Sequence, residues 1–321
     1  MILNVLCIIV GVALVLWGAD RLTEGAAELA RRMEIPEIVI GLTIVAAGTS
    51  APELFVSLVS ALKGTPDLAV GNVVGSNIFN VLLIVGCSAL VAPMTISRAT
   101  VGKDIPFAVM ASLLIALLCL DNFDSLRIMG NTISRLDGVV LLIGFAIFMV
   151  YTFRIAKARG VEPDADEAAA EPMPVWKGVL FVVLGLACLI VGSNLFVGNA
   201  SDLAKSLGVN EGVIGLTIVA GGTSLPDRAT SVVAARKGQS AIAIGNVIGS
   251  NVFNILLILG ATAVICPMQI GGITMVDISM MLVSMVLLWG FSFTKYTVER
   301  WEGATLIFLF FTYMGWLLYN L

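Results

Sequence analysis

Two acidic residues, Glu53 and Asp227, lie in the middle of apolar stretches of the chain. A charged residue at the centre of a membrane helix costs about 2.5–3.5 kcal/mol on insertion scales, so such a carboxylate must face a partner, a cavity or an ion. Each acid directly follows a proline. Because proline has no N–H, the carbonyl four residues earlier loses its helical donor, and a freed carbonyl beside a carboxylate is typical of a site with hard oxygen ligands.

Hydroxyl groups flank both acids with the same spacing. A threonine four residues before each acid and a serine three residues before it project near the helix face of the carboxylate. These hydroxyl residues are Thr49, Ser50, Thr223 and Ser224.

Amide and hydroxyl residues recur in the next apolar stretch of each half, in GNVVGSNIFN (71–80) and GNVIGSNVFN (245–254). Every fourth position is polar, so the side chains form a stripe on an otherwise apolar helix. The stripes consist of Asn72, Ser76 and Asn80, and of Asn246, Ser250 and Asn254. Hydrogen bonding between helices is the alternative explanation for the asparagines, and close helix packing explains the glycines of both motifs.

Carboxylate, hydroxyl, amide and carbonyl oxygens together favour hard cations such as Ca²⁺ and Na⁺. The chain has no histidine, and its five cysteines lie in apolar stretches without a CxxC pair, which argues against a zinc site or a disulfide framework. The absence of histidine also excludes a hydrolase with a Ser–His catalytic pair. An aspartyl-type intramembrane hydrolase built from Glu53 and Asp227 is a remote alternative, because the surrounding oxygens suit an ion better.

The elements that position these residues are membrane helices. Hydrophobic residues make up 59% of the 321 residues and charged residues 12%, and the mean hydropathy is +1.02. Crossing the hydrocarbon core takes about 20 apolar residues, and this pattern predicts an all-α membrane protein with ten transmembrane helices. The first has no basic leader and is expected to be retained. The expected spans are 2–19, 35–62, 68–92, 104–120, 134–154, 175–197, 209–236, 240–266, 275–294 and 302–320.

The two halves of the chain are copies. Residues 41–96 match residues 215–270 at a constant offset of 174, with about 32 identities in 56 positions. The expected domains are a first five-helix repeat (1–156), a cytoplasmic linker (157–174) and a second five-helix repeat (175–321). Five spans per repeat make the repeats inverted, which is typical of secondary transporters that work by alternating access. A symmetric scaffold without transport is the alternative.

Positive charge predicts the orientation. Of the 18 Lys and Arg residues, 13 fall on the side of the linker and 4 on the other, with Arg228 inside a span. Cytoplasmic loops carry the excess, so both termini are expected outside and the linker inside. The expected location is a prokaryotic cell (inner) membrane. The lipid bilayer is the only partner expected besides the transported ions, with no nucleic acid, no obligate protein partner and no cofactor.

The motifs GTSAPE with GNVVGSNIFN, and GTSLPD with GNVIGSNVFN, resemble the two α-repeats of the sodium/calcium exchanger group, in the cation/Ca²⁺ exchanger superfamily, including its prokaryotic members. The resemblance implies a Na⁺/Ca²⁺ antiporter, not an enzyme, with spans 2, 3, 7 and 8 as its core and spans 1 and 6 moving across it. It also implies a set of metal ligands. These are Glu53, Asp227, Thr49, Ser50, Ser76, Asn80, Thr223, Ser224, Ser250 and Asn254, with backbone carbonyls of Ala46 and Ala220.

The chain departs from the family pattern at three positions. Asp227 is shorter than the usual glutamate, and Asn254 is neutral where potassium-dependent members have an acid, so transport is expected to be independent of K⁺. Arg228 is unusual directly after the acid. A Ca²⁺/H⁺ antiporter is the alternative transporter, although the proton-coupled branch is less similar at these motifs. The linker of some 20 residues has no room for large regulatory Ca²⁺-binding domains.

Overall fold

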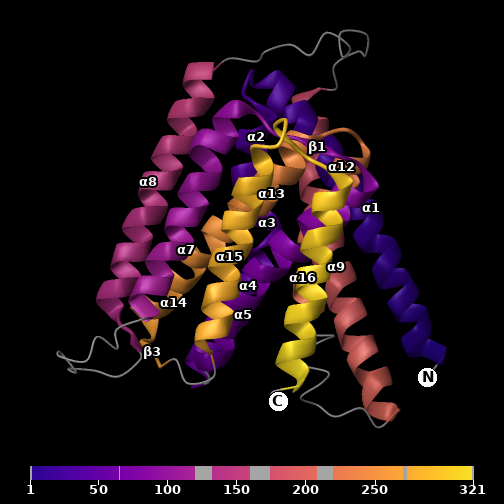
Figure 1. Cartoon of the computed structure of the whole chain (residues 1–321). Helices are drawn as coiled ribbons and strands as arrows, with labels where there is room; N and C mark the ends of the chain where they lie inside the picture. Colours follow the sequence, from indigo (N-terminus) through magenta and orange to yellow (C-terminus); the bar gives the residue numbers. More distant parts are fainter. Residues whose placement is uncertain are drawn as a thin grey trace.

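The computed structural model describes residues 2–64, 66–119, 132–159, 174–207, 220–269 and 273–319. Within these ranges the chain is almost entirely helical (Figure 1). Eight of the described helices are long and apolar enough to cross a membrane, and a ninth span results if one helix pair, bent by 45°, counts as one. The expected span 209–236 begins outside the described residues, so the count of ten stays a prediction.

The helices of the first half follow the expected spans, with two short strands between them. Helix α1 runs well past residue 19 to Arg32, because the residues beyond the apolar part are mostly good helix formers. The elements are α1 (Ile2–Arg32), α2 (Glu37–Ile40), η1 (Gly41–Val45), α3 (Ala46–Thr49), α4 (Ala51–Leu62), α5 (Pro66–Ile78), η2 (Phe79–Val85), α6 (Gly86–Val91), β1 (Met94–Thr95), η3 (Thr100–Asp104), α7 (Ile105–Cys119), β2 (Thr132–Ile133) and α8 (Arg135–Arg159).

The second half repeats this order where it is described. Its elements are α9 (Val175–Ser206), α11 (Ala220–Thr223), α12 (Leu225–Arg236), α13 (Ser240–Val252), η5 (Phe253–Leu259), α14 (Gly260–Ile265), β3 (Met268–Gln269), α15 (Met275–Ser292), β4 (Thr297–Val298) and α16 (Arg300–Tyr319).

Two short antiparallel strand pairs join the halves at opposite ends of the molecule. Strand β1 pairs with β4, with Met94 opposite Val298, and β2 pairs with β3, with Ile133 opposite Met268. Labels β1 and β3 lie at the top and bottom of Figure 1. Met94 and Met268 are separated by the repeat offset of 174. Equivalent strands of the two halves therefore lie at opposite ends.

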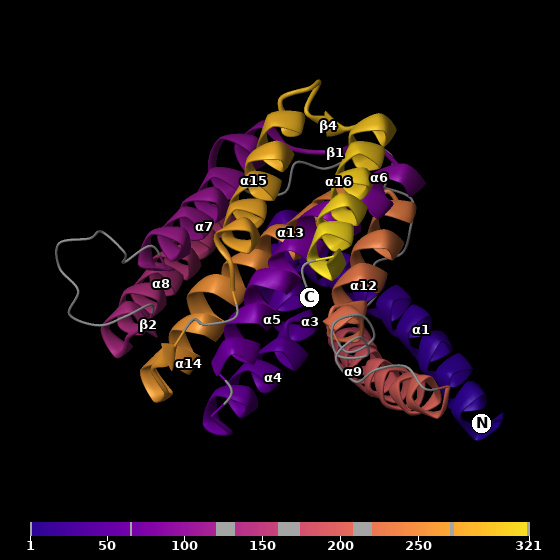
Figure 2. The ribbon, with the colours of Figure 1, turned by 60° about the horizontal axis from the view of Figure 1, so that its bottom comes forward.

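Helices α1 and α9 pack against each other through glycines spaced seven residues apart. A Cβ added at Gly18 would lie 2.8 Å from the carbonyl oxygen of Gly185, and one added at Gly185 would lie 2.7 Å from that of Gly18. Gly11 with Gly192, and Gly25 with Gly178, make equivalent contacts. The two backbones touch along this line, and Figure 2 shows the pair to one side of the other helices.

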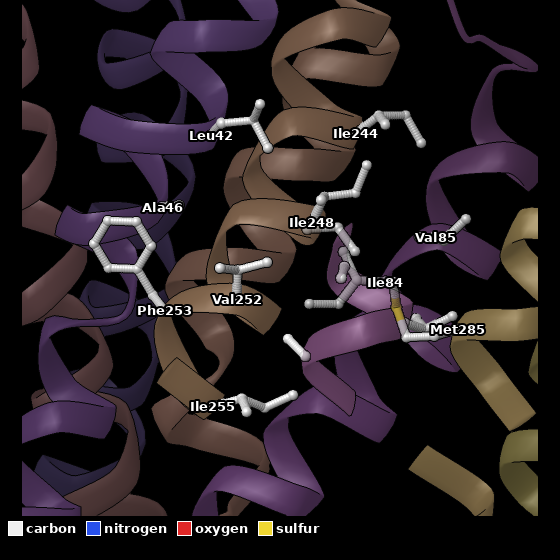
Figure 3. Packing of buried hydrophobic residues seen from close by; sticks show 14 of the residues in the cluster. Leu42, Ala46, Ile84, Val85, Ile244, Ile248, Val252, Phe253, Ile255 and Met285 are labelled. Atoms are coloured by element: carbon white, nitrogen blue, oxygen red, sulfur yellow. The ribbon is translucent and has the colours of Figure 1, made fainter. Parts of the chain in front are cut away.

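The apolar core lies where the central segments of the two halves meet. Figure 3 shows α13 and η5 of the second half beside η1 and η2 of the first, with Ile248, Val252 and Ile84 among the side chains between them. Glycine again permits the close approach, because a Cβ on Gly245 would lie 2.9 Å from the carbonyl oxygen of Ile38. The packing that the sequence predicts for this glycine is confirmed.

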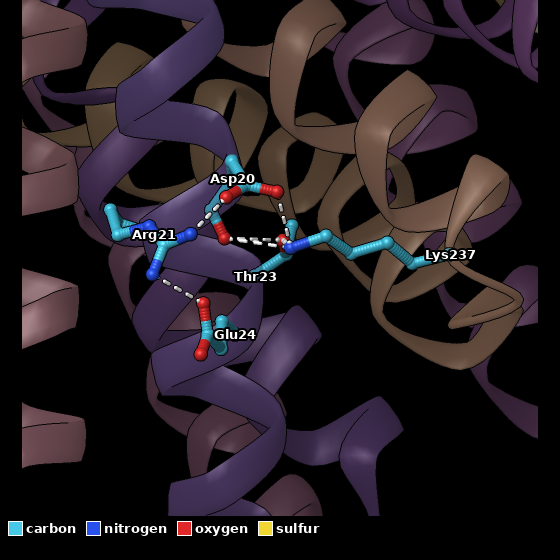
Figure 4. A network of polar contacts seen from close by, with 5 residues as sticks. All are labelled: Asp20, Arg21, Thr23, Glu24 and Lys237. Carbon is cyan, nitrogen blue, oxygen red and sulfur yellow. Dashed lines mark hydrogen bonds and ion pairs between the residues drawn. The ribbon is translucent and has the colours of Figure 1, made fainter.

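A polar network connects α1 to the end of α12. Nζ of Lys237 lies 2.6 Å from Oδ1 of Asp20, and it also donates to the Asp20 carbonyl oxygen at 2.9 Å and to the Thr23 hydroxyl at 3.2 Å (Figure 4). Arg21 lies beside Asp20 and pairs with Glu24 at 2.7 Å. This network holds the α1 and α9 pair to the core at one end of the molecule.

Candidate cation-binding site

The chain breaks its helix directly before each of the two acids. Ser50 separates α3 from α4, and Ser224 separates α11 from α12, with nearly equal backbone angles (φ −85°, ψ 2° and φ −85°, ψ 6°). The prolines that follow lie in the first turn of the next helix, where no N–H is required. Glu53 and Asp227 therefore lie in the first turn of α4 and α12, the position in which the helix dipole favours an anion.

Asp227 is fully buried, and only one of its carboxylate oxygens is hydrogen-bonded. Oδ1 accepts from Nδ2 of Asn246 at 3.2 Å and from the hydroxyl of Ser250 at 2.9 Å. Oδ2 has no hydrogen-bond partner among the described residues. Residues of α13 therefore hold Oδ1 in place, and Oδ2 is available to bind a ligand.

Glu53 is also fully buried, and neither of its carboxylate oxygens has a hydrogen-bond partner in the described part of the chain. Asn72 donates to the backbone carbonyl of Glu53 at 3.2 Å and to the hydroxyl of Ser57 at 3.0 Å, as its repeat equivalent Asn246 does to the carbonyl of Asp227 and to Ser231. No bond from Asn72 to the Glu53 carboxylate is present in the described residues. Glutamate has one more methylene group than aspartate. The longer side chain extends the carboxylate beyond the Asn72 amide, whereas the shorter one stays within reach of α13.

Two further asparagines connect the halves and orient the amides of the site. Nδ2 of Asn80 donates to Oδ1 of Asn251, and Nδ2 of Asn254 donates to Oδ1 of Asn77, both at 3.0 Å. The side-chain oxygens of Asn80 and Asn254 then have no hydrogen-bond partner among the described residues. The amide nitrogens are used in the contact between the halves, and the oxygens are left as acceptors.

The hydroxyl residues also come together from the two halves. Thr49 Oγ1 lies 2.8 Å from the carbonyl oxygen of Val45 and 3.0 Å from Oδ1 of Asn246, and the hydroxyls of Ser76 and Ser224 lie 3.4 Å apart. The buried hydroxyl of Ser50 has no hydrogen-bond partner in the described chain.

The carbonyl of Ala46 is partly used already, since it accepts from the Ser50 N–H at 2.9 Å and lies 3.3 Å from Thr49 Oγ1. The side chains of Ala220 and Thr223 lie outside the described part of the structure, and their place in the site stays a prediction.

The unpartnered oxygens define what the site can bind. Buried polar atoms without a hydrogen bond are rare and costly, and they call for a ligand. Two carboxylates with neutral oxygens around them suit a hard cation. The unpartnered site oxygens are those of Ser50, Glu53, Asn80 and Asn254, with Oδ2 of Asp227. Among the described residues, no three His, Cys, Asp or Glu side chains lie together in a way that could hold a metal ion, so neutral oxygens would complete the coordination of a cation.

The sequence reasoning missed Asn77 and Asn251 as site-shaping residues. Both are buried, and they lie three residues before the candidate ligands Asn80 and Asn254. The signal was present, since both stand at the same position of the two repeat motifs. It was not recognised because they fall off the four-residue stripe.

Comparisons with known proteins agree on one family. The model for the sodium/calcium exchanger protein family matches residues 3–154 and 177–319. The chain is 40% identical to the putative antiporter CaxA of Alkalimonas amylolytica, over 83% of this chain and 82% of that protein. It is 30% identical to the sodium/calcium exchanger MaX1 of Methanosarcina acetivorans, over 98% and 99% of the two chains. The fold matches a structure of the sodium-calcium exchanger NCX_Mj soaked with Na⁺ and Sr²⁺, with a TM-score of 0.84, 30% identity and 98% coverage of both chains.

Proposed function

Because the chain belongs to the sodium/calcium exchanger protein family, we propose that it is a secondary active antiporter that exchanges Na⁺ for Ca²⁺ across the membrane by alternating access. The observation that carries this proposal is that both halves have buried oxygens without a partner, among them those of Glu53 and Asp227, on elements whose polar side chains contact one another between the halves.

The proposed mechanism depends on competition for these two carboxylates. Both are fully buried, so an empty site would hold two negative charges in a low-dielectric environment. Binding of either Ca²⁺ or Na⁺ reduces this negative charge. The loaded site crosses the barrier between its inward-facing and outward-facing states more easily than the empty site, and this couples the two ions.

The proposed architecture has two inverted repeats, 1–156 and 175–321, joined by a cytoplasmic linker over 157–174. The placement of equivalent strands at opposite ends supports this symmetry. In Figure 1 both termini lie at the end opposite to the ends of α8 and α9 that flank the linker. With the charge bias of the loops, this favours termini outside and a linker inside, in a prokaryotic inner membrane.

Purified protein in sealed vesicles tests the proposal. With pH clamped on both sides, an outward Na⁺ gradient should drive Ca²⁺ uptake. Glu53→Gln should abolish the uptake while leaving insertion and thermal stability near normal. Glu302→Gln is the matched control, because Glu302 is also fully buried but lies outside the candidate ligands, and one of its carboxylate oxygens accepts the backbone N–H of Glu299 at 2.8 Å. Equal loss in both variants would point to a structural effect.

A Ca²⁺/H⁺ antiporter is the second candidate, and CaxA, a putative antiporter, leaves the coupling ion open. The same vesicles distinguish the two. Uptake that requires only a pH gradient and ignores Na⁺ would favour proton coupling.

A further inference from the structure

Arg228 adds a positive charge to the helix that carries Asp227. It directly follows Asp227 in α12, and its guanidinium lies over the ring of Phe79, with Cζ 4.7 Å from the ring centroid. Phe79 is the residue before Asn80, whose buried side-chain oxygen has no hydrogen-bond partner among the described residues. Arg228 is therefore adjacent in sequence to one candidate ligand, Asp227, and its guanidinium contacts the residue that precedes another, Asn80.

The side chain is held in this position by its surroundings. Phe310 packs edge-on against Phe79 with ring centroids 4.7 Å apart, and a cation over an aromatic face is attracted by the ring. On another side the guanidinium lies beside Gly221, since a Cβ placed there would make an ordinary contact with Nη1 of Arg228 at 3.7 Å.

The charge of Arg228 is not neutralised by an ion pair in the described part of the chain. Its Nε and Nη2 atoms are buried there without a hydrogen-bond partner. Glu53 and Asp227 occupy equivalent positions of the two repeats, and Arg228 directly follows the second of them. The formal charge of the three groups is −1, whereas the two acids alone carry −2.

The first half of the chain has no such charge. The repeat equivalent of Arg228 is Leu54, and that of Gly221 is Ala47. The two halves therefore give the site equal numbers of acids, but only the second adds a cation.

We propose that Arg228 is a resident cation that takes the place of one transported Na⁺, so that the protein exchanges one Na⁺ fewer per Ca²⁺ than it would with an apolar residue at this position. Its charge also weakens Ca²⁺ binding. This inference rests on the proposed exchange function.

The stoichiometry in vesicles tests it. The Ca²⁺ gradient reached at equilibrium is measured against a series of fixed Na⁺ gradients, with the membrane potential clamped. Arg228→Leu copies the first half, and Arg228→Met keeps a long apolar stem. Both should raise the ratio of Na⁺ to Ca²⁺ by one, and Arg228→Lys should keep the wild-type ratio. Leu54→Met is the neutral control. An unchanged ratio in folded Arg228→Leu and Arg228→Met overturns the proposal.

Calorimetric titration with Ca²⁺ in Na⁺-free detergent solution separates this inference from the proposed function. Removing a like charge near the site should lower the Kd for Ca²⁺ about tenfold in Arg228→Leu and leave it near the wild-type value in Arg228→Lys. If no variant shows Na⁺-driven flux but Arg228→Leu binds Ca²⁺ more tightly, the proposal that Na⁺ is the coupling ion is overturned, whereas the electrostatic effect of Arg228 on Ca²⁺ binding is supported. Equal affinity in all variants overturns that role.

Discussion

The side-chain amide of Asn254 donates to Oδ1 of Asn77, 3.0 Å away in the other half of the chain. Asn80 and Asn251 repeat the contact at the same distance. This pair of bonds fixes which atom of each site amide is free. A cation site that depends on amide oxygens therefore depends on two asparagines that need not bind the ion at all.

Asn77→Ala should weaken both the fold and the site. The substitution leaves Nδ2 of Asn254 without its acceptor, and an unsatisfied buried donor costs about 1–3 kcal/mol. The freed amide can also turn its nitrogen toward the cation. We expect a lower melting temperature and a Ca²⁺ affinity at least severalfold weaker, both measured on purified protein, and a similar result for Asn251→Ala.

Asn199→Ala is the control for these variants. Asn199 also donates from its amide, but to the backbone carbonyl of Leu195 in its own helix. Its loss should leave Ca²⁺ affinity unchanged. An Asn77→Ala protein that loses stability but binds Ca²⁺ normally would show that the contact between the halves is structural only.

Potassium should have no effect on transport. The second-half amide is Asn254, which is neutral, whereas the resemblance implies an acid at this position in potassium-dependent exchangers. Ca²⁺ flux measured without K⁺ and again with K⁺ replacing an inert cation should agree within experimental error. A several-fold increase with K⁺ would contradict the expectation.

Gly185→Ala should separate α1 from α9. The added methyl group would lie 2.7 Å from the carbonyl oxygen of Gly18 and 2.7 Å from the backbone nitrogen of Leu22. Backbone atoms cannot rotate away, so the helices must move apart, at a cost typical of overpacking, about 1–3 kcal/mol. Thermal unfolding in detergent measures this loss.

Gly198→Ala in the same helix is its matched control. A Cβ at Gly198 meets no atom within 4 Å among the described residues, and alanine is the better helix former. Its stability should be unchanged or slightly higher. Equal destabilisation by the two substitutions would mean that the glycine contacts between α1 and α9 are unimportant.

The sequence predicts the ingredients of the site better than their contacts. Two prolines before two acids predict that nearby carbonyls lose their helical donors, and the structure breaks the helix just before each proline, at Ser50 and Ser224, which the predicted spans do not specify. The different surroundings of Glu53 and Asp227 were not predictable from one methylene group, because they depend on how α5 and α13 lie beside the two broken helices. In both halves the equivalent asparagine donates to the backbone carbonyl of the acid and to a serine hydroxyl, and only Asn246 also reaches the carboxylate.

Contacts between distant segments were harder still to infer. Gly11, Gly18 and Gly25 are spaced seven residues apart, as are Gly178, Gly185 and Gly192, but equal spacing alone does not show that the two helices pack against each other. Likewise, nothing in the sequence pairs Asp20 with Lys237, which are 217 positions apart.

The contact of Asp20 with Lys237 should hold one end of the molecule closed. Ion pairs of this exposure contribute at most about 1 kcal/mol, so Asp20→Asn should change the melting temperature little. The local effect should be larger, because Lys237 ends α12 and the pair ties that end to α1. The repeat equivalent of Lys237 is Lys63, which is exposed, and that of Asp20 is Asn194, which has no charge, so the other half cannot form this ion pair.

Hydrogen exchange followed by mass spectrometry measures the opening. Asp20→Asn should speed exchange at residues 233–238 several-fold and leave residues 59–64 unchanged. Glu24→Gln is the matched control, because Glu24 pairs with Arg21 inside α1 and makes no ion pair with α12 in the described chain. If Asp20→Asn and Glu24→Gln exchange alike at 233–238, the end of α12 is held by apolar packing, and the ion pair with Lys237 has no part in closing it.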